Sequence, residues 1–387
     1  MIRKVCVVTG SRADYGLLRG LLTLLRRSHR FQLKLIVTGS HLSPRHGNTW
    51  REIARDGFRI DVRVKIGSAG DTAEGVADSA SRAIKGLARA FGRIGPDIVV
   101  VLGDRYEALA AASAALFCRL PVAHIHGGET TEGAMDEAIR HAITKMSHLH
   151  FVSLPAYRQR VIQLGEAPGR VFVVGALGLD GLRKAELFSR KELQKKLGLS
   201  FAKKNLLVTF HPVTLSPAKS KKQLEELLAA LKGMKNTAII FTMPNADMES
   251  LGLFRMIQKF VRHHPKARAF RSLGRQVYLS CLRHADVVVG NSSSGILEAP
   301  SFRLPSVNVG DRQRGRIQAA STINCEPIRG KITAALKRAV SPAFLHAISS
   351  VKNPYDRGGS AKKILEALLR QKKLISLQKK FYDLRQS

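Results

Sequence analysis

Apolar stretches alternate with amphipathic stretches along most of the chain, and this alternation predicts a series of βα units. The stretch DIVVVLGD, residues 97–104, has a continuous apolar run, which is typical of a strand buried on both faces of a parallel sheet. It is followed by RYEALAAASAALFCR, residues 105–119, which predicts a helix. In the first half we expect strands at 4–10, 31–39, 97–104, 120–129, 148–153 and 170–175, and helices at 15–28, 72–95, 105–119 and 134–147.

The same pattern starts again near residue 180. In the second half we expect strands at 204–212, 236–244, 284–295 and 304–310, and helices at 221–234 and 248–265. Repeated βα units of this kind imply a doubly wound parallel sheet in each half. The fold class is therefore α/β, with domains at 1–178 and 179–360. The basic segment 361–387 predicts one or two amphipathic helices that pack on the body of the protein.

Length and composition agree with a two-domain globular enzyme. A chain of 387 residues is too long for one ordinary core, and a hydrophobic share of 44% argues against extensive disorder. No apolar run approaches the roughly 18 residues that span a bilayer, and the N-terminal apolar run has no signal-peptide cleavage site. The four cysteines are scattered without a C-x-x-C motif, so we expect reduced core thiols in a cytoplasmic protein.

The net charge of +35 favours anionic partners, which include nucleic acids, anionic membranes and nucleotide-linked substrates. The chain has no zinc-finger or RNP-like motif, and aromatic residues make up only 6% of it. We therefore interpret the excess charge as a solvated basic surface, and we expect neither a specific nucleic-acid partner nor a membrane span.

Polar clusters follow nearly every predicted strand, where ligands bind in open α/β sheets. One such loop is ordinary turn chemistry, but a whole series of them across two domains predicts a ligand cleft between the domains. The clusters are Arg12, GDR at 103–105, HGGE at 126–129, FHP at 210–212, PNAD at 244–247, GNSSSG at 290–295 and GDRQRGR at 310–316.

GNSSSGILEAP, residues 290–300, is the best phosphate candidate, because it follows a buried strand and precedes a short helical segment. The alternative is an ordinary serine N-cap. Glu298 could compensate the helix dipole or accept hydrogen bonds from ribose hydroxyls. The residues of this anion site are Ser292, Ser293, Ser294 and Gly295, with Arg12, Arg312 and Arg316 as candidates to neutralise a diphosphate.

Three carboxylates, Asp104, Glu129 and Asp136, are candidate general acids and bases. The alternatives are a helix N-cap for Asp104 and a dipole-compensating role for Asp136. His211 follows a strand, where it would face the cleft, although a structural histidine is about equally compatible with that position. His124 and His126 alternate on one strand, but no third ligand has suitable spacing, so we expect no metal.

In this order the motifs resemble the hydrolysing UDP-N-acetylglucosamine 2-epimerases of sialic acid and related nonulosonate pathways. They cover most of residues 5–360. The matching segments are TGSRADYG, GNT, GDRYEALAAA, HIHGGE, DEAIRHAITKMSHLHFVS, FHPVT, PNAD, GNSSSGILEAP, GDRQRGR and NPYDRGG. The non-hydrolysing epimerases carry a GTRPE-type first loop and a T-H-R-x-E-N segment, where this chain has GSRADYG and FHPVT.

The resemblance implies a glycosyltransferase-B-like fold of two Rossmann-like domains, with C-terminal helices crossing back onto the first. It also implies a UDP-sugar substrate, no cofactor and a homo-oligomer, either a dimer or a tetramer. The catalytic positions that it implies are Asp104, Glu129, Asp136 and His211. The substrate-binding positions are Arg12, His141, Asn245, Asp247, Ser292, Ser293, Ser294, Gly295, Glu298, Arg312 and Arg316.

The implied reaction releases UDP from C1, passes through a 2-acetamidoglucal and gives free N-acetylmannosamine after water adds. The sugar could instead be a 2,4-diacetamido relative of N-acetylglucosamine. A non-hydrolysing epimerase or a UDP-sugar glycosyltransferase of the same fold remains an alternative, as does a basic nucleic-acid-associated protein that has lost catalysis. The residues do not decide which carboxylate is the acid and which is the base.

Overall fold

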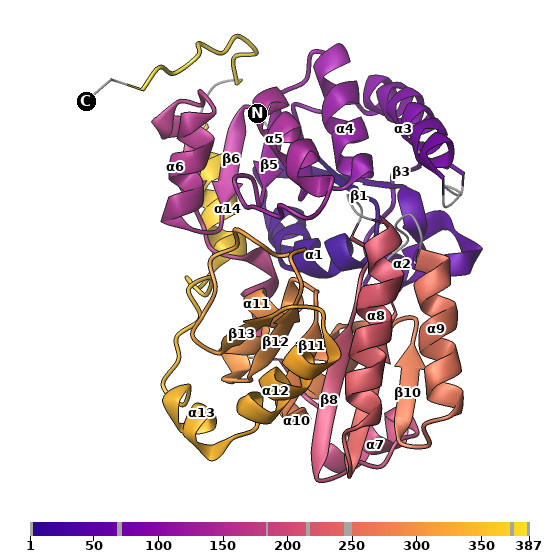
Figure 1. Cartoon of the computed structure of the whole chain (residues 1–387). Coiled ribbons are helices and arrows are strands. Elements are labelled where there is room, and N and C mark those ends of the chain that lie inside the picture. Colours follow the sequence, from indigo (N-terminus) through magenta and orange to yellow (C-terminus); the bar gives the residue numbers. More distant parts are fainter. Residues whose placement is uncertain are drawn as a thin grey trace. The chain divides into compact units, whose positions relative to one another are not determined.

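The chain divides into two compact units in this computed structural model. The first comprises Met1–Glu129, Asp136–Asp180 and Arg357–Ser387, and the second comprises Thr130–Met135 and Gly181–Asp356. Figure 1 labels their elements. The structure describes residues 3–67, 72–182, 185–213, 217–243, 250–371 and 375–384. Within these ranges no helix combines the length and apolar character that crossing a membrane requires.

The first unit contains a seven-stranded parallel sheet in the order β3-β2-β1-β4-β5-β6-β7. The order runs outward in opposite directions from β1 and β4, so the topological switch point lies between these two strands. The strands are β1 (Arg3–Thr9), β2 (Phe31–Val37), β3 (Val62–Arg63), β4 (Ile98–Leu102), β5 (Val122–Ile125), β6 (Leu149–Val152) and β7 (Val171–Val173).

Helices cover both faces of this sheet, which explains why its central strands are almost wholly apolar. Val5 and Val7 of β1 belong to one core cluster, with apolar residues of α1 and α14, whereas Cys6 and Val8 belong to another, with residues of α3 and α4. The helices of this unit are α1 (Arg12–Arg27), α2 (Trp50–Arg55), α3 (Ala73–Ile94), α4 (Tyr106–Phe117), α5 (Asp136–Met146), α6 (Pro155–Gln163) and α14 (Ser360–Arg370).

The second unit repeats the plan with a six-stranded parallel sheet in the order β10-β9-β8-β11-β12-β13. Its switch point lies between β8 and β11. The strands are β8 (Lys204–Thr209), β9 (Thr237–Thr242), β10 (Ala267–Phe270), β11 (Val287–Gly290), β12 (Ser306–Val309) and β13 (Thr322–Cys325). The helices are α7 (Arg190–Leu197), α8 (Pro217–Lys232), α9 (Ser250–Arg262), α10 (Gly274–His284), α11 (Ser294–Leu297), α12 (Arg329–Ala339) and α13 (Pro342–Ala347).

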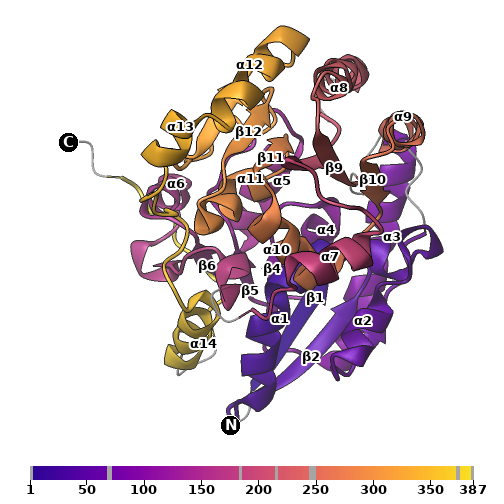
Figure 2. The ribbon, with the colours of Figure 1, turned by 90° about the horizontal axis from the view of Figure 1, so that it is seen from below.

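Helix α14 is part of the first unit although it comes after the second unit in the sequence. It packs beside α1, as two views show (Figure 1 and Figure 2). Its first turn is capped by Asp180, whose carboxylate accepts the backbone N–H groups of Ser360 at 2.8 Å and Ala361 at 2.6 Å. A carboxylate at a helix N-terminus satisfies orphan donors and complements the helix dipole.

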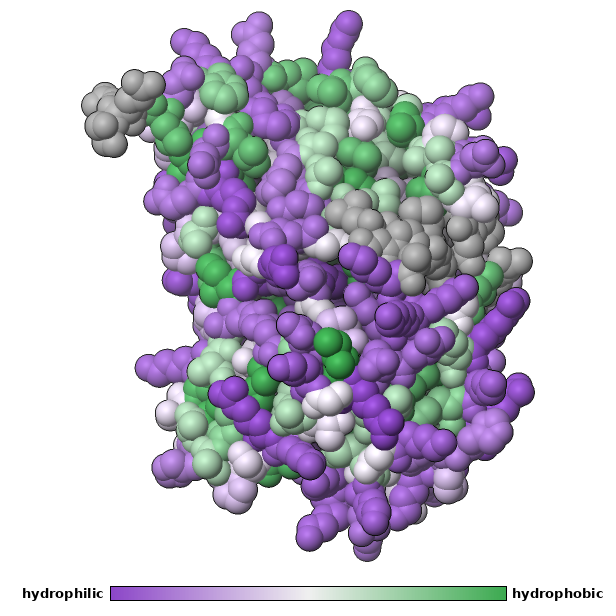
Figure 3. All heavy atoms as spheres, viewed as in Figure 1, coloured by the Kyte–Doolittle hydropathy of each residue, from purple (hydrophilic) through white to green (hydrophobic). Residues whose placement is uncertain are grey.

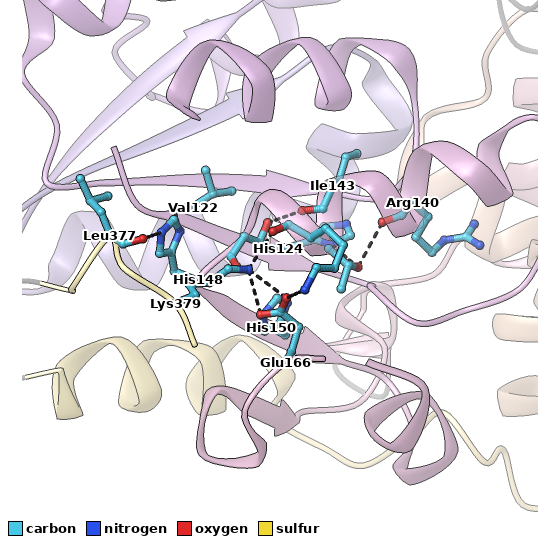
Figure 4. A network of polar contacts seen from close by, with 12 residues as sticks. Val122, His124, Arg140, Ile143, His148, His150, Glu166, Leu377 and Lys379 are labelled. Atoms are coloured by element: carbon cyan, nitrogen blue, oxygen red, sulfur yellow. Dashed lines mark hydrogen bonds and ion pairs between the residues drawn. The ribbon is translucent and has the colours of Figure 1, made fainter. Parts of the chain in front are cut away.

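Beyond α14, the described tail residues 375–384 are not helical and lie on the first unit. The Lys379 ammonium donates to the main-chain oxygens of Lys145 and Ser147, at 2.7 and 2.6 Å, and to both Glu166 carboxylate oxygens, at 2.9 Å (Figure 4). His150 also contacts Glu166, at 3.0 Å. The tail is therefore fixed at the end of α5 by charged hydrogen bonds.

The surface agrees with the high charge of the chain. On the face drawn in Figure 3, hydrophilic side chains predominate and hydrophobic ones form scattered spots. All four cysteines are free, and Cys6 and Cys281 are buried. Burial raises the pKa of Cys281 to about 12, so this thiol is inert at neutral pH.

Candidate functional site

The predicted site residues in the described chain lie mainly at the carboxyl ends of central strands. In the first unit Arg12 follows β1, Asp104 follows β4 and Glu129 follows β5. In the second unit His211 follows β8, and residues 292–295 follow β11. The parallel topology of each sheet brings these loops to one edge, which in open α/β sheets is the ligand-binding edge.

In the first unit Asp104 forms an ion pair with Arg140 of α5. The Arg140 side chain is only 1% exposed, whereas that of Asp104 is 23% exposed. Arg140 also donates to the main-chain oxygen of Glu129, at 2.8 Å, and to the carboxylate of Glu137, at 3.2 Å. A single guanidinium thus joins the loops after β4 and β5 to the first turns of α5.

The charge of Arg140 is balanced within this cluster. Burial opposes its charge, but the carboxylates of Asp104 and Glu129 outweigh burial and raise its pKa. Arg140 is not among the predicted site residues, although it lies in the segment DEAIRHAITKMS. An arginine among so many basic residues gives no signal until the fold shows its burial.

Glu129 is a buried carboxylate that His126 and Ser153 contact. Its Oε1 lies 3.0 Å from His126 Nδ1 and accepts a hydrogen bond from Ser153 Oγ at 2.9 Å. The backbone N–H of Leu177 donates to His126 Nε2 at 3.2 Å. These contacts hold the buried Glu129 carboxylate in a fixed orientation.

Asp136 and His141 both lie on α5. Asp136 is its first residue, where a carboxylate complements the helix dipole. The Nε2 of His141 lies 3.1 Å from Glu137 Oε1, and its buried Nδ1 has no hydrogen-bond partner among the residues that the structure describes. An imidazole nitrogen without a partner can still bind a ligand, so His141 stays a candidate contact.

Arg12, predicted to bind a diphosphate, is the first residue of α1 and pairs with Glu52 of α2 at 2.9 Å. Its loop is held by a capping box, in which Ser11 accepts the Asp14 backbone N–H and Asp14 accepts that of Ser11. Burial raises the pKa of Asp14 to about 6. Because Arg12 pairs with Glu52, its charge is already neutralised within its own unit. Its role as a diphosphate ligand stays a prediction.

In the second unit Asn291 fixes the position of His211. The Asn291 amide accepts the His211 backbone N–H at 2.7 Å and donates to the His211 carbonyl at 2.9 Å. Gly290 makes the close approach possible, because its φ is +129° and a Cβ there would collide with the Thr209 carbonyl. Asn291, which the sequence analysis missed as a functional residue, thus ties the ends of β8 and β11 together.

The serine loop after β11 leads into α11, which is one turn long and is followed by Pro300. The Ser294 hydroxyl donates to Glu298 Oε2 at 2.6 Å and also bonds to the Tyr278 hydroxyl. Burial raises the pKa of Glu298. The hydroxyl of Ser294 thus holds Glu298. Ser292, Ser293 and Gly295 remain candidate anion ligands.

The arginine loop after β12 contacts the same strand end. Arg312 donates to the Asn291 carbonyl at 3.3 Å, and Gln313 donates to it at 3.0 Å. Among the residues that the structure describes, the Arg312 Nε is buried and has no hydrogen-bond partner. In the same loop the Arg316 backbone N–H donates to the Gln313 carbonyl at 3.3 Å. A buried guanidinium N–H without a partner is a donor that an anionic ligand could satisfy.

Two predicted substrate contacts, Asn245 and Asp247, lie outside the described residues. Within the part of the chain that the structure describes, no group of three or more His, Cys, Asp or Glu residues could hold a metal. His124 is used structurally, because its ring bonds to the Gly103 carbonyl at 2.8 Å and burial lowers its pKa to about 3.

Comparisons with known proteins extend over nearly the whole chain. The family model for UDP-N-acetylglucosamine 2-epimerase matches residues 23–369. The "GDP/UDP-N,N'-diacetylbacillosamine 2-epimerase (hydrolyzing)" of Campylobacter jejuni is 41% identical over 325 residues, 84% of this chain and 84% of that protein. "Polysialic acid biosynthesis protein P7" of Escherichia coli is 38% identical over 387 residues, 99% of this chain and 98% of that protein.

A solved structure confirms the fold prediction. The UDP-GlcNAc 2-epimerase from Neisseria meningitidis bound to UDP-GlcNAc matches with a TM-score of 0.82 and 18% identity, over 95% of this chain and 100% of that one. Together with the two parallel sheets, this match confirms the glycosyltransferase-B-like class with two Rossmann-like domains.

Proposed function

Because the chain belongs to the UDP-N-acetylglucosamine 2-epimerase family, we propose that it is a hydrolysing 2-epimerase. It converts a UDP-linked 2-acetamido sugar into the free sugar with inverted C2 configuration and UDP. The observation that carries this proposal is the similarity to the Campylobacter jejuni relative, which is named for hydrolysing 2-epimerase activity on a diacetamido sugar. A 2,4-diacetamido sugar is therefore the first substrate to test. UDP-N-acetylglucosamine is the second, since the Escherichia coli relative serves polysialic acid biosynthesis.

The chemistry explains why carboxylates and cations are both needed. The C2–H of a 2-acetamido sugar has no neighbouring carbonyl in the ring and is hardly acidic. In the proposed sequence the C1–O bond breaks first and its electron pair leaves with UDP. The C2 proton then passes to a carboxylate as the C1=C2 bond of a 2-acetamidoglucal forms. Water adds its oxygen to C1, and a proton returns to C2 from the opposite face.

We assign proton transfer to the edge of the first unit. Asp104 is partly exposed and paired with Arg140, which favours its ionised form and suits a base. Glu129 is buried and fixed by Ser153 and His126, so its geometry suits a positioned acid or base. Asp136 at the start of α5 is the third candidate, as a water-activating or proton-returning group.

We assign UDP to the loops of the second unit. Arg312 and Arg316 supply positive charge for the diphosphate, together with His211 and the loop formed by residues 292–295. Glu298, buried and held by Ser294, is the candidate to accept ribose hydroxyls. A preorganised donor at a developing negative charge is typically worth about 3–4 kcal/mol, and Arg12 of the first unit is a further candidate.

The test is NMR analysis of products in ²H₂O and in ¹⁸O-labelled water, with each UDP-sugar in turn. We expect free sugar carrying deuterium at C2 and ¹⁸O at C1, with unlabelled UDP. Formation of the intact UDP-linked C2 epimer would contradict hydrolysis, and absence of turnover with both sugars would contradict the proposal as a whole. A homodimer or homotetramer is expected, which light scattering tests.

A further inference from the structure

The structure shows that His126 is bonded on both sides of its ring. On one side Nδ1 lies 3.0 Å from Glu129 Oε1, and on the other Nε2 lies 3.2 Å from the Leu177 backbone nitrogen. A backbone N–H can only donate, so Nε2 must accept and carry no proton. The proton of the neutral ring is therefore on Nδ1, where it is donated to Glu129.

The backbone around His126 is held as firmly as the ring. Its φ of +67° is unusual for a residue other than glycine, and its N–H bonds to the Phe151 carbonyl at 2.8 Å. The next two residues are tightly enclosed. A Cβ at Gly127 would lie 3.0 Å from His124, and one at Gly128 would lie 2.5 Å from the Tyr157 carbonyl. Left-handed backbone at a non-glycine residue persists when its surroundings impose it, and it gathers at functional sites.

We propose that His126 is a positioning residue for the epimerase reaction and acts through Glu129. It fixes the direction of the Glu129 carboxylate by donating Nδ1–H to Oε1, the same oxygen that Ser153 Oγ contacts at 2.9 Å. Leu177 in turn fixes the tautomer of His126, because its backbone N–H can only donate and therefore requires an unprotonated Nε2. This proposal rests on the proposed function and adds to it a residue that the catalytic assignment leaves out.

The tautomer has a direct consequence for catalysis. A neutral imidazole that donates to a carboxylate orients it without adding a full positive charge beside it. A charged group in place of His126 would add to the positive charge that the buried Arg140 already places near Glu129. Supporting groups of this kind typically change activity about 10–100-fold when removed.

Side chains that imitate one half of the imidazole provide the test. In His126→Asn the amide nitrogen takes the place of Nδ1, and asparagine tolerates the left-handed backbone. In His126→Gln the amide lies nearer the place of Nε2. We expect kcat of the Asn variant within about 10-fold of wild type, and kcat of the Gln and Ala variants lower by about 100-fold, with little change in KM. The exposed His346→Asn is the matched control.

A double-mutant cycle separates positioning from a merely structural role. If His126 acts through Glu129, His126→Ala causes no further loss of kcat in a Glu129→Gln background. Losses that multiply, or a Gln variant as active as the Asn variant, would overturn the proposal. Circular dichroism and thermal unfolding identify any variant that fails to fold, and the folded Asn and Gln variants then decide.

An independent measurement keeps this inference distinct from the proposed function. Long-range ¹H–¹⁵N correlation spectra of the free wild-type protein report which ring nitrogen of each histidine carries the proton, and His126→Asn identifies the signal. We expect Nδ1–H for His126. An Nε2–H tautomer would overturn the inference even in an active epimerase. An Nδ1–H tautomer in a protein that turns over no UDP-sugar would overturn the proposed function and, with it, a catalytic role for His126.

Discussion

Replacing Lys379 with methionine should loosen the C-terminal tail and destabilise the first unit. The ammonium of Lys379 makes the charged contacts that hold residues 375–384 at the end of α5, through two main-chain carbonyls and both oxygens of Glu166 (Figure 4). Two further contacts of the tail, Leu377 O with His148 and Tyr382 N–H with Gly165 O, remain in the variant. Methionine keeps the aliphatic stem but removes all of these donors. Lys380→Met is the matched control, because Lys380 is the next residue in the chain and is exposed.

The size of the effect follows from burial. Removing one partner of a fully buried ion pair costs about 3–5 kcal/mol, whereas an exposed pair contributes about 0–1 kcal/mol. The Glu166 side chain is 4% exposed but that of Lys379 is 26% exposed, and Glu166 keeps Lys145 and His150 as partners. We therefore expect a loss of about 2 kcal/mol in the free energy of unfolding at pH 7.

The pH dependence supplies a second, signed test. Burial would raise the pKa of Glu166, but hydrogen bonds from His150, Lys145 and Lys379 together lower it to about 2. A lowered carboxylate pKa stabilises the fold above the ordinary value of about 4.5, and this contribution is lost as the pH falls towards 2. The difference between wild type and Lys379→Met should therefore be largest above pH 4.5 and shrink below it.

Urea unfolding from pH 7 to pH 3 measures the free-energy difference, and limited proteolysis reports release of the tail. We expect faster cleavage within 375–384 in Lys379→Met than in either wild type or Lys380→Met. A change below about 0.5 kcal/mol at pH 7, with unchanged cleavage, would refute the reasoning, because it would mean that the charged contacts to Glu166 contribute no more than a surface pair.

Three further predictions concern the central strands of the two sheets and the loops at their carboxyl ends. Asp104→Asn and Glu129→Gln should each lower kcat at least about 100-fold while UDP binding, measured by calorimetry, is unchanged; near-normal turnover would remove that residue from the mechanism. Gly290→Ala should lower the free energy of unfolding by at least about 2 kcal/mol, because a Cβ would strike the Thr209 carbonyl, and an unchanged urea midpoint would show that this approach relaxes. His124→Gln should flatten the pH dependence of stability, because burial lowers the pKa of His124 from 6.5 to about 3. The wild type therefore loses about 1.4 kcal/mol of its free energy of unfolding per pH unit as the pH falls through this range. Parallel stability curves for the two proteins would contradict this.

The strands at the centre of each sheet could be predicted from the sequence, whereas short strands at the edges could not. Strand β4 is buried on both faces and therefore appears as an uninterrupted apolar run. The edge strands β3, β10 and β13 were all missed. They are two to four residues long, and their side chains are mostly not fully buried, so they leave no distinctive pattern.

The carboxylates of the candidate site could be predicted from the sequence, whereas their partners could not. Parallel topology alone places the loops that carry Asp104 and Glu129 at one sheet edge, so these carboxylates could be selected from strand ends. Their partners come from distant positions. Arg140 lies 36 residues after Asp104, and Asn291 lies 80 residues after His211. Nothing local in the sequence marks such pairs, since the contact exists only once separate βα units have packed.

The two sheet edges differ in charge, and this difference supports dividing the chemistry between them. In the first unit the buried side chain of Arg140, on α5, forms ion pairs with Asp104 and Glu137. A carboxylate cluster held in place in this way favours proton transfer. In the second unit the carboxylate of Glu298 is held by Ser294, while a buried N–H of Arg312 has no partner in the described part of the chain. An anionic diphosphate would satisfy that donor, whereas the carboxylate cluster of the first unit would repel it. The leaving group is therefore best assigned to the second unit and the C2 proton to the first.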